Sequence, residues 1–172
     1  MPRLNTLLYK QALDTLEKTT DHMQIIEILQ GFRPKSSKDL YMRVRKLLIE
    51  KKNQIFVLRT KGNSDNMQTE RYKNIVDTLF TLASNRPKIN GVYTEYAKDD
   101  VNELLTHYEE DLKDMTLVLD PEYLTRLSQT LYILKTREFE GVFQRIEEGL
   151  NNQKDKLDTY HVVNILRSFV HS

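Results

Sequence analysis

The feature that most constrains the fold of this 172-residue chain is a pattern that occurs twice near the C-terminus, at a spacing of 38 residues. In the first half of the pattern, the recurring pairs are Val101 and Phe139, Leu104 and Val142, Leu105 and Phe143, Tyr108 and Ile146, and Leu112 and Leu150. In the second half they are Leu119 and Leu157, Asp120 and Asp158, Leu124 and Val162, Leu127 and Ile165, and Leu131 and Phe169. Apolar residues three or four positions apart lie on one face of a helix. Each copy therefore predicts two helices, and consecutive copies predict a helical repeat whose units bury their apolar faces on their neighbours.

The composition favours the same fold class. Five glycines and four prolines leave few places for tight hairpin turns, whereas good helix formers are plentiful. We therefore predict an all-α fold, a short α-solenoid of antiparallel helix hairpins with about 38 residues per repeat. A single domain is expected over residues 1–172. Its parts are a basic, degenerate helical part (1–62), a loop and helix (63–97) and two repeat units (98–135 and 136–172).

Residues typical of helix ends mark several boundaries. Gly31 is expected to end a helix, and Pro34 follows it as a breaker. Asp120 is expected to cap the next-to-last long helix, with Pro121 at its first helical position, and Asp158 repeats this cap 38 residues later. Residues 61–67 (KGNSDNM) predict a loop.

Charge is distributed unevenly along the chain. Residues 1–97 contain 17 lysines and arginines and 10 aspartates and glutamates, a net charge of +7. Residues 98–172 contain 9 and 15, respectively, a net charge of −6. Such asymmetry predicts oppositely charged partners for the two parts.

The most basic stretch, residues 33–61, is the strongest functional signal in the sequence. Its candidate contacts to an anion, RNA or an acidic partner are Arg43, Arg45, Lys46, Lys51, Lys52 and Arg59, with Tyr41 and Phe56 as candidate stacking residues. A solvated helix face, a face that docks on an acidic protein, or a contact with anionic lipid headgroups would need the same charges. We favour these three interpretations over nucleic acid, because near-zero total charge is unusual for a dedicated nucleic-acid-binding protein.

The residue patterns of common enzyme sites are missing. There is no cysteine, no pair of histidines four residues apart and no Glu-x-x-His for a carboxylate-bridged metal pair. Glycine-rich phosphate loops and the G-x-S-x-G nucleophile motif are also missing. We therefore expect no catalytic, cofactor-binding or metal site, and no cofactor.

No stretch of the sequence is long and apolar enough to predict a membrane span. The first 20 residues lack the apolar core of a secretory signal, and Asp14 and Glu17 distinguish them from an acid-poor transit peptide.

The unit of 38 residues, the L-x-x-L-x-x-x-L pattern of its second helix and the final segment TYHVVNILRSFVHS resemble the degenerate α-hairpin repeats of the octotricopeptide and heptatricopeptide type. The chain has no tryptophan and lacks the Pro-Pro-Pro-Glu-Trp signature of the octotricopeptide class. Proteins with such repeats occur in organelles, so the resemblance implies a mitochondrial location, in the matrix or on the matrix face of the inner membrane.

Two functions are compatible with these features. The first is a non-enzymatic accessory or scaffold subunit of a large mitochondrial assembly, with a respiratory or ATP synthase complex favoured. Its partners would be neighbouring protein subunits, and Phe169 and Val170 are candidate interface residues because no polar capping helix follows them. The alternative is an organellar RNA-binding repeat protein or a mitochondrial ribosome component that uses the basic stretch.

Overall fold

The computed structural model describes residues 2–32, 38–57, 64–85, 88–89, 92–93, 98–133 and 140–170. Its first α-helices are α1 (Pro2–Lys18), α2 (His22–Gly31), α3 (Lys38–Glu50), α4 (Lys52–Ile55) and α5 (Ser64–Ser84). The later ones are α6 (Lys98–His107), α7 (Glu109–Met115), α8 (Pro121–Ile133), α9 (Glu140–Asn151) and α10 (Thr159–Val170), with the short 3-10 helix η3 (Lys154–Lys156) before α10. Two two-residue strands, β1 (Lys88–Ile89) and β2 (Val92–Tyr93), pair in antiparallel fashion. The predicted helical character of the chain is confirmed.

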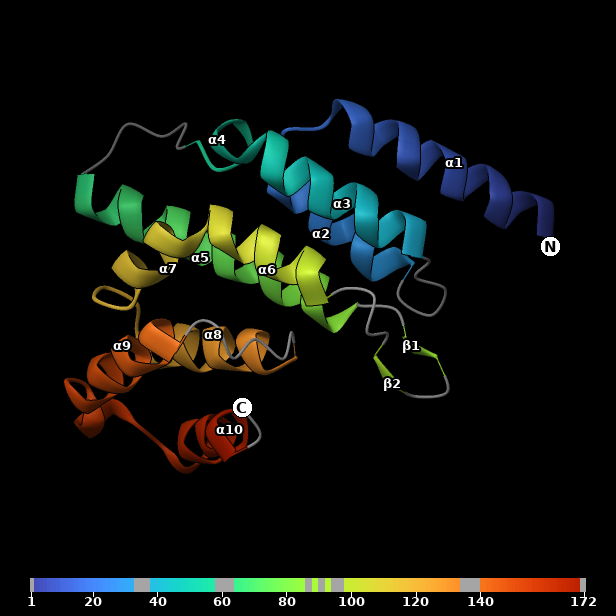
Figure 1. The fold of residues 1–172 in the computed structure, drawn as a ribbon. Coiled ribbons are helices and arrows are strands. Elements are labelled where there is room, and N and C mark those ends of the chain that lie inside the picture. The colour runs from blue at the N-terminus through green and yellow to red at the C-terminus, as the bar shows by residue number, and fades with distance from the viewer. Residues whose placement is uncertain are drawn as a thin grey trace.

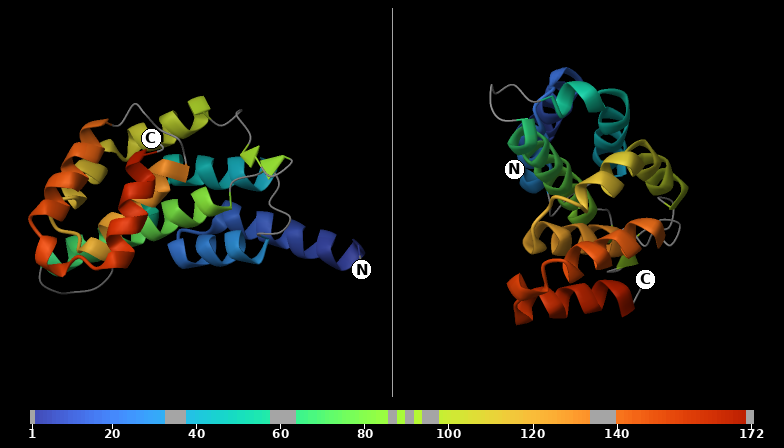
Figure 2. Two further views of the ribbon diagram at one scale, coloured as in Figure 1. Left: turned by 90° about the horizontal axis from the view of Figure 1, so that it is seen from below. Right: turned by 90° about the vertical axis from the view of Figure 1, so that its left-hand side faces the viewer.

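The helices pack in two rows that follow the order of the chain. In one row α2 packs on α5, α5 on α8, and α8 on α10. In the other, α3 packs on α6, and α7 packs on α9. The stack therefore begins with α1, α2 and α3 and ends with α10 at the opposite side of the molecule, while α1 extends beyond the other helices (Figures 1 and 2).

The described apolar residues in the first half of the recurring pattern belong to one core in both copies. In the first half of the pattern, Leu104, Leu105, Tyr108 and Leu112 are buried, and so are their counterparts Val142, Phe143, Ile146 and Leu150. Tyr108 and Ile146 are both fully buried. Equivalent residues of the first half of the pattern therefore face the interior in both copies.

The two predicted aspartate caps are confirmed. The Asp120 carboxylate accepts a hydrogen bond of 3.0 Å from the backbone N–H of Tyr123, in the first turn of α8. The Asp158 carboxylate accepts one of 2.9 Å from the backbone N–H of His161, in the first turn of α10. The His161 ring accepts the Asp158 backbone N–H in return, so both groups at this helix start are satisfied.

The structure differs from the sequence prediction at three boundaries. The first helix of the 98–135 unit is divided at Tyr108, which leaves helical geometry (φ −110°, ψ 4°) and whose hydroxyl donates a 2.6 Å hydrogen bond to the Leu48 carbonyl in α3. Helix α5 begins at Ser64, inside the predicted loop, because serine and aspartate there start a helix as readily as they form a turn. The hairpin of β1 and β2 was not predicted from the sequence.

Candidate functional site

The candidate site lies between the last two helices. Helix α9 buries Val142, Phe143, Ile146 and Leu150, which lie three or four residues apart, and turns its glutamates toward solvent. After η3, Asp158 starts α10, which packs on α8. Helices α9 and α10 therefore both pack on α8 at the end of the stack, on opposite sides of a space between them.

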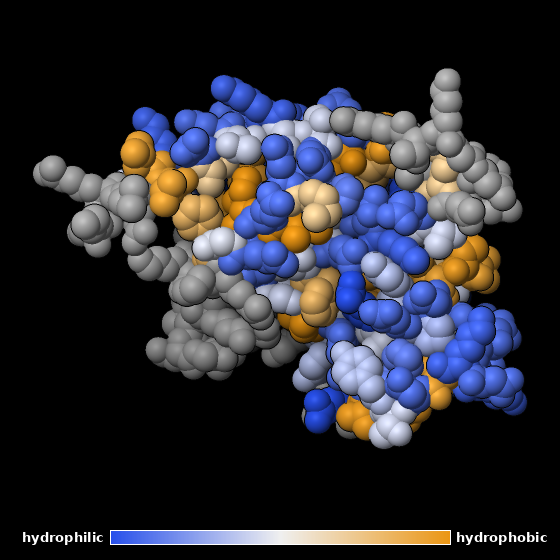
Figure 3. Space-filling model, turned by 180° about the vertical axis from the view of Figure 1, so that it is seen from behind, coloured by the Kyte–Doolittle hydropathy of each residue, from blue (hydrophilic) through white to orange (hydrophobic). Residues whose placement is uncertain are grey.

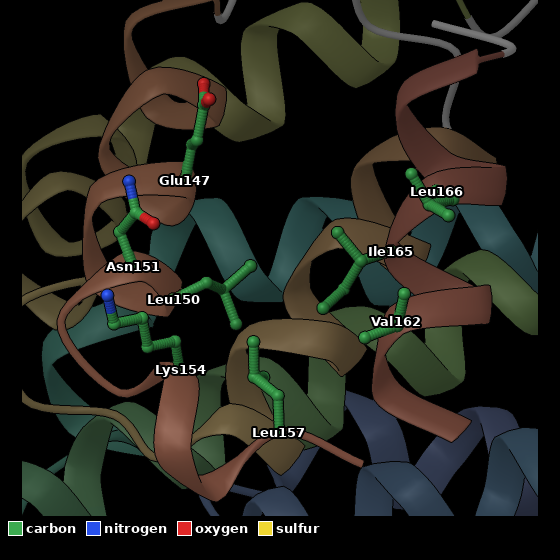
Figure 4. A pocket seen from close by; sticks show the side chains of 8 residues that line it. All are labelled: Glu147, Leu150, Asn151, Lys154, Leu157, Val162, Ile165 and Leu166. Carbon is green, nitrogen blue, oxygen red and sulfur yellow. The ribbon is translucent and has the colours of Figure 1, made fainter. Parts of the chain in front are cut away.

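A groove of about 450 Å³ opens between α9 and α10. Its lining comprises the apolar side chains Leu150, Leu157, Val162, Ile165 and Leu166 and the polar side chains Glu147, Asn151 and Lys154. In Figure 4 the side chains of Leu150, Leu157, Val162 and Ile165 converge, whereas Glu147, Asn151 and Lys154 lie along the α9 side. An apolar floor with a polar edge on one side suits an amphipathic protein segment.

The surface of α10 continues the apolar character of the groove. The exposed fraction is 42% for Val162, 40% for Val163, 56% for Leu166 and 64% for Tyr160. Apolar atoms interrupt the hydrophilic surface at the α10 end of the molecule (Figure 3). Contiguous apolar surface of this kind in a folded protein typically marks a contact with another molecule.

The predicted interface residues Phe169 and Val170 are in the last turn of α10, but their side chains fall outside the described residues. The exposed apolar residues that the structure describes in α10 lie earlier in the same helix. Periodicity predicts that Val162 and Ile165 lie on the buried face of this helix, as their counterparts Leu124 and Leu127 do in α8. In the structure Leu124 and Leu127 are fully buried, whereas Val162 is exposed and Ile165 is half-buried.

The described cations of the basic stretch engage acidic side chains or backbone carbonyls. Arg43 forms ion pairs with Glu17 (3.2 Å) and Asp39 (3.4 Å), and the largely buried Arg45 pairs with Glu103 of α6. Lys51 donates a hydrogen bond of 3.1 Å to the Glu17 carbonyl. The acidic groups that meet these cations come from α1, α3 and α6, which sequence position alone did not indicate.

Two further cations of the stretch differ in exposure. Lys46 lies 3.8 Å from Glu50 and its side chain is 71% exposed. Lys52 forms an ion pair of 2.7 Å with Asp111 and donates a 2.6 Å hydrogen bond to the His107 carbonyl. Arg59 lies outside the described residues.

The two candidate stacking residues of the stretch are in the core. Tyr41 is 1% exposed and Phe56 is 4% exposed. The Phe56 ring meets the Tyr108 ring edge-to-face, with 6.0 Å between centroids. Because both rings are buried, they are not accessible for stacking on bases in the folded chain.

Asp111 of α7 joins the basic and acidic parts of the chain. Its two carboxylate oxygens accept Arg71 of α5 (2.6 Å) and Lys52 of α4 (2.7 Å). Burial alone would raise the pKa of the Asp111 carboxyl, but the hydrogen bonds and positive charges of Arg71 and Lys52 together outweigh it and lower this pKa. The Arg71 side chain also donates a hydrogen bond of 3.2 Å to the Phe56 carbonyl, which links the end of α4 to the same cluster.

A second ion cluster lies between α5 and α8. Asp77 of α5 pairs with Arg126 of α8 and accepts a 3.2 Å hydrogen bond from the Tyr123 hydroxyl. Burial, followed by the negative charge of Asp77, raises the pKa of the Tyr123 hydroxyl. These two clusters hold successive helices together and have the chemistry of structural contacts.

The described residues contain no group of three or more histidine, aspartate and glutamate side chains arranged to hold a metal ion. Among the helices that the structure describes, none combines the length and apolar character required to cross a lipid bilayer. Comparison with known proteins adds no identification, since no family model matches the chain and neither a characterised protein nor a solved structure is significantly similar to it.

Proposed function

We propose that the chain is a non-enzymatic scaffold subunit, a short α-solenoid of antiparallel hairpins with about 38 residues per repeat, that binds neighbouring proteins of a large assembly. The observation that carries the proposal is the apolar groove between α9 and α10, with Val162 and Leu166 exposed along it. A helical repeat stack buries apolar surface on each successive unit, and apolar side chains that remain exposed on such a stack suit the binding of a partner protein.

The two-row packing supports the solenoid part of the proposal. Helices α5, α8 and α10 follow one another in one row, and α7 and α9 follow one another in the other. Helices α8 and α10 begin at Pro121 and Thr159, which are 38 residues apart. This order is the one expected if each hairpin covers the previous one.

The proposed partner is protein and not RNA. The cations of the basic stretch that the structure describes engage acidic side chains or backbone carbonyls, and both aromatic candidates are buried. A mitochondrial assembly, such as a respiratory or ATP synthase complex, is proposed on the family resemblance alone.

Native sedimentation tests the proposal. The tagged chain, expressed in its own cells, should fractionate with mitochondria and sediment with a particle much larger than 20.4 kDa. The double variant Val162→Glu/Leu166→Glu should move to the low-mass fraction, because two carboxylates would have to be desolvated at the interface. Leu117→Glu is the matched control, since Leu117 is 74% exposed but lies in the turn after α7, away from the groove. A wild-type chain that sediments alone would refute the proposal.

A further inference from the structure

The groove between α9 and α10 has an occupied counterpart inside the molecule. Subtracting 38 from the numbers of four lining residues, Asn151, Lys154, Leu157 and Val162, gives Lys113, Thr116, Leu119 and Leu124. These four residues lie on α7, on α8 and in the turn between them. They form the surface on which α9 lies.

Helix α9 contacts this surface through three residues spaced four apart. The Arg145 side chain donates a hydrogen bond of 3.4 Å to the Lys113 carbonyl. Just after α9, the Gln153 side chain donates one of 2.9 Å to the Leu119 carbonyl. Midway between them lies Gly149.

Gly149 marks the closest approach of the two units. A Cβ atom at this position would lie 2.7 Å from the Thr116 carbonyl oxygen and 3.2 Å from a Leu124 methyl carbon. Only glycine fits here without displacing backbone, because a carbon atom such as Cβ does not approach a carbonyl oxygen so closely. The α9 helix therefore crosses the first unit at a small residue, with a hydrogen-bond donor four residues before and four residues after the crossing.

The surface under α9 and the open groove between α9 and α10 differ in the exposure of their apolar side chains, as expected if a helix covers only the first. Leu112, Leu119, Leu124 and Leu127, the first-unit counterparts of Leu150, Leu157, Val162 and Ile165, are all fully buried. In the open groove, Val162 is 42% exposed, and Leu157 and Ile165 are half-buried. The lining of the open groove thus has the apolar positions of a helix-binding surface and lacks the helix.

We infer that the groove between α9 and α10 is a receptor for an amphipathic helix of a partner protein that repeats the binding pattern of α9, namely donor-x-x-x-small-x-x-x-donor. The small residue crosses beside Lys154 and Val162, the counterparts of Thr116 and Leu124. The two donors reach the carbonyls of Asn151 and Leu157, the counterparts of Lys113 and Leu119. The inference rests on the proposed scaffold function and specifies the kind of partner it binds.

A peptide of this chain is the probe that tests the inference. Residues 140–156 are synthesised with a fluorescent label and a hydrocarbon staple between positions 144 and 148, which are both exposed in α9. The staple is needed because a free helix of this length is marginal in water. Anisotropy titration with the full chain should give saturable binding at one site per chain.

Matched variants show whether the peptide uses the groove. Leu166→Glu and Val163→Glu both place a carboxylate on an exposed apolar position of α10, but only Leu166 lines the groove. Leu166→Glu should weaken binding by at least about tenfold, and Val163→Glu by less than about twofold. A peptide with Gly149→Leu should also bind at least about tenfold more weakly, because the crossing has no room for a side chain. The circular dichroism of both protein variants should match the wild type.

Three results of the peptide titration would overturn the inference. They are absence of saturable binding, equal loss of binding with Val163→Glu, or undiminished binding of the Gly149→Leu peptide. A dimer of the chain that Leu166→Glu dissociates would also overturn it, since a second copy would then fill the groove. If the peptide fails to bind while Val162→Glu/Leu166→Glu still releases the chain from its large particle, the helix-receptor inference fails and the scaffold function stands. If the peptide binds but the chain sediments alone in its cells, the scaffold function fails.

Discussion

Two contacts between successive helices of the stack, one at Asp111 and one at Gly149, differ in their chemistry. Asp111 and Gly149 are 38 residues apart, and each lies where one hairpin meets the previous one. At the first junction, Asp111 binds Arg71 and Lys52, and charge holds the helices together. At the second, Gly149 lets α9 approach the Thr116 backbone directly, and close packing holds the helices together. The difference teaches that the two copies share their recurring apolar residues, whereas the residues 38 positions apart at Asp111 and Gly149 differ and make contacts of their own in each copy.

Removing the charge at the first junction should have the largest effect. Asp111→Ala leaves two largely buried cations without their shared carboxylate, so the free energy of unfolding should fall by about 3 kcal/mol. Urea denaturation at pH 7 measures the change, and Asp114→Ala, at an exposed position of the same helix, should change it by less than about 0.5 kcal/mol.

The effect of Asp111→Ala should also depend on pH. The pKa of Asp111 is lower in the folded chain than in the unfolded chain, so its contribution is present above the unfolded pKa of about 3.9 and is lost as the pH falls through the folded pKa. The difference between wild type and Asp111→Ala should therefore shrink below about pH 4. A difference that stays constant down to pH 2 would contradict the charged junction.

Adding one methyl group at the second junction should have the next largest effect. Gly149→Ala places a carbon 2.7 Å from the Thr116 carbonyl oxygen and should lower the free energy of unfolding by about 2 kcal/mol, in spite of the better helix propensity of alanine. Gly141→Ala in the same helix is the control, because no atom lies within 4 Å of the added carbon. It should be neutral or stabilising by up to about 1 kcal/mol, and equal melting temperatures for both variants would rule out a close crossing at Gly149.

The comparison extends to the equivalent buried residues Tyr108 and Ile146, of which only Tyr108 has a hydroxyl group. Tyr108→Phe removes the hydrogen bond to the Leu48 carbonyl and should cost about 1 kcal/mol. Burial, then the charge of Asp111, raises the pKa of the Tyr108 hydroxyl, so its contribution is complete below the unfolded pKa of about 10 and is lost as the pH rises through the folded pKa. Denaturation between pH 9 and pH 11 should show a steeper loss of stability for wild type than for Tyr108→Phe.

Removal of an aspartate cap should have the smallest effect on stability, and hydrogen exchange should show which helix it affects. Asp158→Ala removes the acceptor at the start of α10 and should cost about 0.5 kcal/mol, at the low end for a cap because α10 is the outermost helix. Hydrogen exchange should accelerate in α10 and remain unchanged in α8. Acceleration in both helices would mean that α8 and α10 unfold as one unit.

The sequence is sufficient to predict the helices and caps of the C-terminal part, since those features depend on residues three or four positions apart. The burial of Tyr108 and Ile146 and the capping roles of Asp120 and Asp158 follow from such local rules. The ion pairs formed by cations of the basic stretch could not be predicted, because Lys52 of α4 and Asp111 of α7 come together only in the folded chain. Nor does periodicity distinguish a covered apolar face from an open one: Leu124 and Val162 occupy the same place in the pattern, but only Leu124 has a helix over it.

The Asp111 cluster has a consequence for how the protein assembles. It links cations encoded before residue 98 to a carboxylate encoded after it, in a chain whose two portions carry opposite net charge. Two separate polypeptides divided at that point would attract each other over a distance before any apolar contact formed, and added salt would slow their recombination. Although the whole protein is nearly neutral, the opposite charges of its two portions should therefore promote complementation between its own fragments.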